Sequence, residues 1–304
     1  MLRFVALALL ACGATAWTSP SGLRLFGKPH TRAPSSRSFS TPSMALESPV
    51  KDFSVILLAG GVGSRMKAGM PKQFLELRGK PVLMHTLELF LGLDGVKEVV
   101  LVVAPEYRDD FKGLADSAPN GAKLVFADPG KERQDSVSNG LDASHAEAPL
   151  VCIHDAARPL VTPAEIFSVL RDAMEHGAAV LGVPMKATVK EATPDGEFVV
   201  KTVDRSLLWE VQTPQVIKPS LLREGFKKAN ELNWQVTDDV SIIEQLGLPV
   251  KLTAGEYTNI KLTTPDDMQV CDRWGAKSMT RLFGGTGTQA TGRPPAGGQP
   301  MRTA

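Results

Sequence analysis

The sequence predicts an α/β fold in which helices cover both faces of a mostly parallel β-sheet. Between Phe53 and about Thr280, short apolar runs alternate with segments of helical periodicity. Strands that alternate with helices in this way form parallel sheets. The first apolar run, Val55 to Leu58, has no helical period and ends in a glycine-rich turn, which is typical of a buried parallel strand. In such sheets ligands bind beyond the carboxyl ends of the strands, where this turn lies.

Five apolar runs are predicted as strands, and four periodic segments between them as helices. The predicted strands are Phe53–Ala59, Glu98–Ala104, Ala122–Ala127, Leu150–Ile153 and Ala178–Val183. The predicted helices are Val82–Leu91, Tyr107–Ala115, Asp135–Ala143 and Pro163–Glu175. Thr162 followed by Pro163 is typical of a helix N-cap and the first helical position. The pattern therefore favours a Rossmann-like sheet with helices on both faces.

A β-hairpin interrupts this alternation after the fifth predicted strand. Lys186–Glu191 and Glu197–Val203 have the composition of strands, and the turn Thr193–Gly196 lies between them. A lone hairpin is barely stable in water, so its apolar side chains need a partner surface. We call residues 186–206 the arm and expect it to pack against another subunit.

Both ends of the chain are predicted to lie outside the folded domain. Residues 1–17 contain a short apolar stretch followed by small residues, as in a signal peptide, and residues 18–50 resemble a transit peptide. The segment from Thr18 to Leu46 is basic and rich in serine, and it contains no acidic residue. A single secretory signal is the alternative. The domain is expected over 51–281, and the Gly- and Pro-rich residues 282–304 form a tail predicted to be disordered.

Composition excludes several classes of function. The net charge is +1 and the sequence pI is about 7.7, so the chain has no basic surface of the size that nucleic-acid binding requires. Its three cysteines are too widely spaced for a zinc motif or a disulfide framework. The apolar stretch Phe4–Cys12 is too short to span a membrane. We therefore expect neither nucleic acid nor a membrane as a partner.

The glycine-rich turn after the first strand is suited to binding a polyanion. Glycines allow backbone N–H groups to approach a phosphate closely, and Arg65 and Lys72 follow the turn. A dinucleotide fingerprint is excluded because Met66 stands where its third glycine belongs, and no P-loop is present. The remaining pattern, A-G-G-x-G-x-R-M followed by P-K-Q, is similar to the signature of nucleotidyltransferases. A strand–turn–helix junction with surface cations is the alternative.

Six further blocks follow in the same order and spacing as in a known family. They are Pro129–Val137, Ile153–Pro159, Thr202–Arg205, Gln212–Gln215, Val236–Asp239 and Asn259–Asp267. With the first motif they resemble the 2-C-methyl-D-erythritol 4-phosphate cytidylyltransferases, most strongly the plant plastid form, over residues 53 to 280. The resemblance implies the nucleotidyltransferase fold. Ala59-Gly60-Gly61, where many bacterial members have Ala-Ala-Gly, also resembles ribitol-5-phosphate cytidylyltransferases, which are the competing family.

The resemblance implies transfer of CMP from CTP to 2-C-methyl-D-erythritol 4-phosphate, with Mg²⁺ as the cofactor and pyrophosphate as the second product. The catalytic residues it implies are Arg65, Lys72, Arg205 and Lys261. It places CTP against Ala59, Gly60, Gly61, Gly63, Gly130, Lys131, Ser136 and Asp155. It assigns the second substrate to Arg205, Thr213 and Lys261, and the metal to Asp155.

Several of these residues have a structural alternative. Asp155 could be an N-cap or the ion-pair partner of Arg158, and Thr213 could be a turn or cap residue. His154 is expected to be structural, because a substrate phosphate needs no base near neutral pH. A non-catalytic nucleotide sensor predicts the loss of Arg65, Lys72 or Lys261, and all three are present.

The resemblance also implies a homodimer formed through the arm. Arg205 at the base of the arm would then reach the substrate bound mainly by the other subunit. The leader predicts transport to the plastid stroma, which agrees with the plant-type resemblance.

Overall fold

The computed structural model describes residues 47–61, 70–114 and 118–283 of the 304-residue chain. The predicted signal peptide, nearly all of the transit peptide, Gly63, Arg65 and most of the predicted tail lie outside these residues. None of the described helices is both long and apolar enough to cross a membrane.

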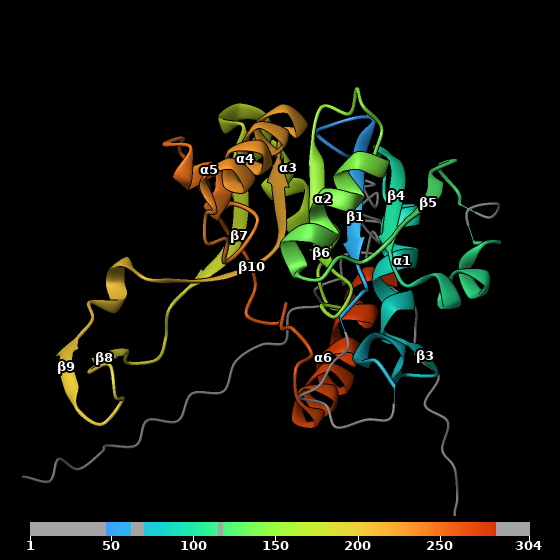
Figure 1. Ribbon diagram of the computed structural model, residues 1–304. Helices are drawn as coiled ribbons and strands as arrows, with labels where there is room; N and C mark the ends of the chain where they lie inside the picture. Colours follow the sequence, from blue (N-terminus) through green and yellow to red (C-terminus); the bar gives the residue numbers. More distant parts are fainter. Residues whose placement is uncertain (1–46, 62–69, 115–117, 284–304) are drawn as a thin grey trace, which may run out of the picture. The chain divides into compact units, whose positions relative to one another are not determined.

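A seven-stranded sheet forms the centre of the domain, in the order β11-β7-β10-β6-β1-β4-β5 (Figure 1). Its strands are β1 (Phe53–Leu58), β4 (Val96–Val102), β5 (Lys123–Ala127), β6 (Val151–Asp155), β7 (Ala178–Pro184), β10 (Trp209–Ile217) and β11 (Lys251–Ala254). Only β10 runs antiparallel to its neighbours, β6 and β7, whereas the other paired strands are parallel. The predicted mostly parallel sheet is confirmed.

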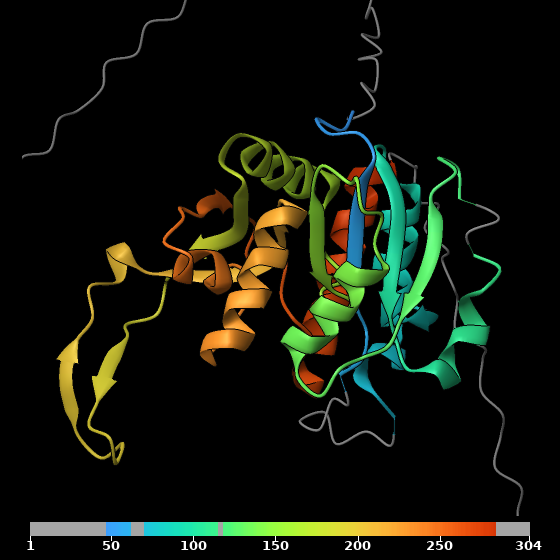
Figure 2. The same ribbon diagram turned by 45° about the horizontal axis from the view of Figure 1, so that its top comes forward.

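Helices cover both faces of the sheet. They are α1 (Val82–Gly92), α2 (Arg133–Ala143), α3 (Pro163–His176), α4 (Pro219–Leu232), α5 (Ser241–Gln245) and α6 (Pro265–Phe283). Alternate residues of a strand point to opposite faces. Thus Val55 and Leu57 of β1 pack with α1 and α3, whereas Ile56 packs with α2, α4 and α5. Figures 1 and 2 show α2 and α4 on the same side of the sheet.

The shorter elements complete the chain between the sheet strands. They are the 3₁₀ helices η2 (Lys72–Phe74), η3 (Pro105–Phe111) and η5 (Arg205–Leu207), the ribbon of β2 (Glu76–Leu77) and β3 (Lys80–Pro81), and the arm strands β8 (Lys190–Ala192) and β9 (Val199–Thr202). The segment predicted as a helix from Tyr107 is thus a 3₁₀ helix that starts at Pro105.

The arm extends away from the sheet in both ribbon views (Figures 1 and 2). Its two strands pair antiparallel, which confirms the predicted hairpin. Phe198, Val199 and Val200 are 67%, 60% and 56% exposed. Three consecutive apolar residues with that exposure are not covered by any part of the chain that the structure describes.

The register of β10 is irregular next to the arm. Val211 pairs with Gly182 of β7 and Gln215 pairs with Val180, so residues 212–214 of β10 face the single residue Leu181 of β7. An irregularity of this kind turns side chains out of the regular ladder and re-aims them. This irregular stretch lies immediately beside the carboxyl end of β6.

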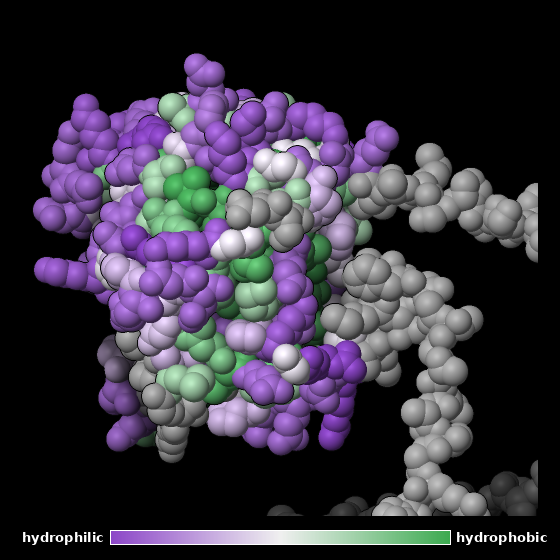
Figure 3. Space-filling model, turned by 90° about the vertical axis from the view of Figure 1, so that its right-hand side faces the viewer, coloured by the Kyte–Doolittle hydropathy of each residue, from purple (hydrophilic) through white to green (hydrophobic). Residues whose placement is uncertain are grey.

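The fold begins before the predicted boundary at residue 51. Val50 is 4% exposed in the apolar core, and the Ser48 backbone N–H donates to Asp94 Oδ2 at 2.9 Å. Residues 48–50, which the sequence pattern assigned to the leader, therefore pack onto the domain. β5 is the edge strand next to β4, and it is only partly buried at Leu124, Val125 and Phe126. Apolar side chains reach the surface among hydrophilic ones on this side of the molecule (Figure 3).

Candidate active site

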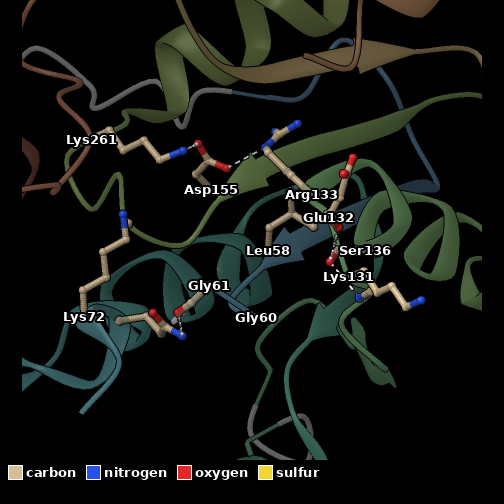
Figure 4. A pocket seen from close by; sticks show the side chains of 13 residues that line it. Leu58, Gly60, Gly61, Lys72, Lys131, Glu132, Arg133, Ser136, Asp155 and Lys261 are labelled. Atoms are coloured by element: carbon tan, nitrogen blue, oxygen red, sulfur yellow. Dashed lines mark hydrogen bonds and ion pairs between the residues drawn. The ribbon is translucent and has the colours of Figure 1, made fainter. Parts of the chain in front are cut away.

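A cleft of about 350 Å³ opens at the carboxyl ends of β1 and β6 (Figure 4). Its lining residues are Leu58, Gly60, Gly61, Lys72, Gln73, Gly130, Lys131, Glu132, Arg133, Ser136, Asp155, Ala157 and Lys261. Four of these are cations and two are carboxylates, so the lining has an excess of positive charge. A cleft of this size with such a lining suits a phosphorylated small molecule.

The glycine-rich turn forms one wall of the cleft. A Cβ atom on Gly60 would lie 2.5 Å from Pro129 Cβ, so only glycine fits where the two turns meet. Gln73 fixes the turn by donating from Nε2 to the carbonyl oxygens of Ala59 at 2.5 Å and Gly61 at 3.0 Å. Because Gln73 uses these acceptors, the turn is left to offer backbone N–H donors to a ligand.

The start of α2 forms the facing wall. Gly130 N–H donates to Ser136 Oγ at 2.9 Å, and Ser136 Oγ donates to the Glu132 carbonyl at 3.1 Å. Ser136 therefore lies in the cleft wall, and its hydroxyl stabilises the turn that precedes the helix. A Cβ atom on Gly130 would overlap with Asp135. The positive end of the α2 dipole faces the cleft, which favours an anion there.

Asp155 ends β6 at the centre of the site and contacts three cations. Its carboxylate lies 2.8 Å from Lys261 Nζ, 3.4 Å from Arg133 Nε and 3.8 Å from Arg158 Nε. Burial alone would raise the pKa of Asp155, but Arg133, Lys261 and Arg158 hold it well below its usual range. The carboxylate is therefore ionised at neutral pH.

Arg133 joins Asp155 to a second buried carboxylate. Its two terminal nitrogens contact Asp239 at 2.6 and 2.9 Å in a bidentate pair. Burial works against the charged form, but Asp239 and Asp155 raise the pKa of Arg133 above its ordinary value. Arg133 is thus a fixed charge, with one edge of its guanidinium on Asp239 and Nε towards Asp155.

One short segment, residues 259–262, brings Lys72 and Lys261 to the same side of the cleft. Lys261 belongs to this segment, and Lys72 Nζ donates to the Leu262 carbonyl at 2.8 Å. The Leu262 N–H in turn donates to the Ala157 carbonyl at 2.8 Å. Figure 4 shows Lys72 and Lys261 on one side of the cleft and Lys131 on the other. A ligand in the cleft would lie between these cations.

A buried chain of hydrogen bonds supports Asp155 from beneath. The Asp155 N–H donates to Thr213 Oγ1 at 3.1 Å, and Thr213 Oγ1 lies 3.0 Å from His154 Nδ1. His154 Nε2 lies 3.2 Å from the Arg158 carbonyl, which only accepts, so Nε2 carries the proton and Nδ1 accepts from Thr213. Burial, as the largest cause, lowers the pKa of His154 to about 4, so the ring is neutral.

Comparison with known proteins decides between the families that the motifs left open. The family model IspD, 2-C-methyl-D-erythritol 4-phosphate cytidylyltransferase, matches residues 53–274. The chain belongs to this family. The family is one of nucleotidyltransferases, so the match also favours an enzyme over a non-catalytic sensor.

Curated relatives support the assignment. The chain is 55% identical over 223 residues to the chloroplastic 2-C-methyl-D-erythritol 4-phosphate cytidylyltransferase of Oryza sativa subsp. japonica, covering 73% of this chain and 74% of the relative. It is 45% identical over 217 residues to the enzyme of the same name from Geobacillus thermodenitrificans, covering 71% of this chain and 94% of the relative.

Solved structures support the same fold. The crystal structure of the cytidylyltransferase from Thermus thermophilus is similar with a TM-score of 0.60 and 33% identity, covering 74% of this chain and 99% of that one. The 4-diphosphocytidyl-2C-methyl-D-erythritol synthase of Anaerococcus prevotii is similar with a TM-score of 0.65 and 26% identity, with the same coverage.

The structure brings most of the predicted site residues of this family member together. Those that line the cleft are Gly60, Gly61, Lys72, Gly130, Lys131, Ser136, Asp155 and Lys261. Ala59 is buried behind the glycine turn, and Thr213 is buried beneath Asp155 without lining the cleft. Arg205 does not line it either, because this side chain is at the base of the arm, where Nη1 donates to the Lys186 carbonyl at 2.8 Å. Gly63 and Arg65 lie outside the described residues.

Sequence reasoning gave no role to Gln73 or Arg133, and it named Arg158 only as an alternative ion-pair partner of Asp155. Gln73, Arg133 and Arg158 all belong to the sequence blocks that carried the resemblance. Their place in these blocks was therefore the sequence signal that could have identified them as site residues. Arg133 contacts Asp239 and Arg158 contacts the Asn259 carbonyl, 106 and 101 positions away, and no local pattern identifies contacts over such separations.

The donor set at Asp155 fits a divalent metal that is bound together with a nucleotide. No cluster of three or more His, Cys, Asp or Glu side chains occurs in the described part of the chain. Mg²⁺ uses one or two protein carboxylates and takes its other oxygens from substrate phosphates and water. One ionised carboxylate at the cleft is therefore a sufficient protein ligand.

Proposed function

We propose that the chain transfers CMP from CTP to 2-C-methyl-D-erythritol 4-phosphate, forming 4-diphosphocytidyl-2-C-methyl-D-erythritol and pyrophosphate. The observation that supports it most directly is the cationic cleft around ionised Asp155, at the strand ends of a chain that belongs to the cytidylyltransferase family. The reaction belongs to isoprenoid synthesis by the methylerythritol phosphate pathway.

The chemistry requires positioning and neutralisation of charge more than covalent catalysis. A phosphate oxygen of methylerythritol phosphate attacks the α-phosphorus of CTP. The bond from that phosphorus to the oxygen bridging to the β-phosphate breaks, and its electron pair leaves on pyrophosphate. Both reactants are anions, so cations must hold them in line. The neutral, fully hydrogen-bonded His154 has no proton-transfer step to perform.

The cations of the cleft divide between the two reactants. Lys72, together with Arg65, stabilises the charge that develops on the α-phosphate and pyrophosphate, and a group of this kind contributes a few kcal/mol. Lys261 and the partner subunit's arm hold methylerythritol phosphate in line for attack. The Asp155 carboxylate keeps Lys261 at a fixed place, 2.8 Å from its own oxygen.

The nucleoside part of CTP lies between the two glycine turns. Gly60 and Gly61 on one wall, and Gly130, Lys131 and Ser136 on the other, allow close approach of the base and ribose. Mg²⁺ bound to Asp155 and the triphosphate would neutralise negative charge on the phosphates. Its role is electrostatic, and the protein residues remain responsible for orientation.

The active form is a homodimer joined through the arm, residues 186–206. The exposed Phe198, Val199 and Val200 require a covering surface, and a second copy of the chain supplies one by isologous pairing. Arg205 lies outside the cleft of its own chain, which supports its contribution to the cleft of the other subunit.

The enzyme works in the plastid stroma after removal of a bipartite leader. Support comes from the basic, acid-free segment before residue 47 and from the similarity to a chloroplastic relative. Residues 284–304 take no part in this proposal, because their composition offers little apolar surface to bury.

The decisive experiment is pyrophosphate release by a chain that begins at Glu47. We expect release with CTP, Mg²⁺ and methylerythritol phosphate, and much slower release when ATP, UTP or GTP replaces CTP. Ribitol 5-phosphate is the control acceptor. Turnover of ribitol 5-phosphate comparable to that of methylerythritol phosphate would refute the proposal.

A further inference from the structure

Asn259 is fully buried behind the cleft, and its side-chain amide joins two parts of the chain. Its Nδ2 donates to the Thr213 carbonyl at 2.9 Å and to Gln212 Oε1 at 3.1 Å. Both acceptors belong to the irregular stretch of β10. A backbone carbonyl only accepts, so the nitrogen of the amide must face Thr213, and this fixes the orientation of the side chain.

The backbone that follows Asn259 places two of the cations at Asp155. Arg158 Nη1 donates to the Asn259 carbonyl at 2.7 Å. Two residues further on, Lys261 Nζ reaches Asp155 Oδ2 at 2.8 Å. Lys261 has a long stem and its side chain is 35% exposed, so side-chain packing alone does not fix the position of its charge. Its position depends on where the backbone of residues 259–262 lies.

This segment is held at both ends. The Leu262 N–H donates to the Ala157 carbonyl at one end, and the Asn259 amide binds β10 at the other. Loss of the amide would release the end nearer Arg158 and leave two buried acceptors without their donor, which favours a shift of the segment.

We propose that Asn259 is a positioning residue for nucleotidyl transfer, because it fixes the 259–262 segment against β10 and so sets Lys261 and Arg158 around Asp155. The meaning of this for catalysis rests on the proposed function. The positioning itself rests on the hydrogen bonds alone, and it can be measured separately.

Asn259→Ala tests the proposal with two independent measurements. Brief reaction with acetic anhydride, followed by mass spectrometry, reports how accessible the Lys261 amine is relative to the exposed Lys251. We expect labelling of Lys261 to rise severalfold relative to Lys251. We also expect kcat/KM for methylerythritol phosphate to fall by about tenfold or more, with the KM for CTP unchanged. Gln212→Leu removes one of the two bonds and should give a smaller change of the same kind.

Thr253→Val is the matched control for a loss of stability alone. Thr253 is 3% exposed on β11, and its hydroxyl donates to Asp172 at 2.6 Å away from the cleft. This variant should melt at a lower temperature, with Lys261 labelling and both KM values unchanged. Unchanged labelling and kinetics in Asn259→Ala would overturn the proposal, as would the same changes in Thr253→Val. Failure of the unsubstituted chain to release pyrophosphate would refute the proposed function only, since labelling still tests the positioning.

Discussion

Replacing Asp155 by asparagine should destabilise the fold by an amount that depends on pH. The substitution keeps the size of the side chain but removes the charge that faces Lys261, Arg133 and Arg158. Breaking a buried ion pair from one side costs about 3–5 kcal/mol, because the remaining charge is left uncompensated. Arg133 keeps Asp239 as a partner, so we expect the lower end, about 3 kcal/mol at pH 7. For a domain of this size that corresponds to about 6–12 °C in the melting temperature.

The sign of the pH dependence follows from the lowered pKa of Asp155. A carboxylate whose folded-state pKa is depressed stabilises the fold above its unfolded pKa of about 3.9, and this stability is lost as the pH falls towards the folded value. The free energy of unfolding of the Asp155→Asn variant should therefore be lower than that of the unsubstituted chain, and this gap should be constant above about pH 5. The gap should narrow below about pH 4.

Urea unfolding of both chains across this pH range measures the gap directly. Glu165→Gln is the control, because burial raises the pKa of Glu165 and reverses the sign. The unsubstituted chain should lose stability relative to that variant as the pH rises above the unfolded pKa of glutamate, about 4.3. A gap for Asp155→Asn below about 1 kcal/mol at pH 7, or one that stays constant to pH 3, would refute the reasoning.

Three further predictions follow from the site and the ends of the fold. Lys72→Ala should lower kcat by about two orders of magnitude or more, whereas Lys261→Ala should act chiefly on the KM for methylerythritol phosphate, as steady-state kinetics will show. Mixing Arg205→Ala chains with Lys72→Ala chains should restore some activity, because a shared site takes Arg205 from one chain and Lys72 from the other. No recovery despite proven subunit exchange would contradict the shared site. The free energy of unfolding of a chain that starts at Lys51 should be about 2 kcal/mol lower than that of a chain that starts at Glu47. Equal midpoints of urea unfolding would contradict this.

Local pattern was enough to predict five of the six parallel strands of the sheet, and it missed β11. The apolar runs of β1, β4, β5, β6 and β7 have no competing signal, and each was predicted within about two residues of its observed bounds. The antiparallel strand β10 was missed because Pro214 and the buried polar side chains of Gln212 and Gln215 interrupt its apolar pattern. Tertiary hydrogen bonds satisfy those amides, and a sequence pattern does not contain them.

Individual residues of the candidate site could be named from the sequence, but the hydrogen bonds and ion pairs that join them could not. The glycine turn and Lys72 follow from local chemistry, and Asp155 from its place after a strand. The pair of Arg133 with Asp239 spans 106 positions, and the contact of Lys72 with Leu262 spans 190. Contacts over such separations depend on the topology of the sheet. This is also why Thr213, an expected substrate contact, lies under Asp155 in the structure.

The irregular stretch of β10 supports the site without belonging to the regular ladder of the sheet. Residues 212–214 face one residue of β7, so a chain two residues shorter here could continue the regular ladder. Such a chain would keep its sheet and its core, but it would lose the Thr213 support under Asp155 and the Asn259 anchor in one step. Inactive relatives could therefore arise with the central sheet and its apolar core retained. The length of this short stretch, more than the overall identity of two sequences, should distinguish active members of the family from silent ones.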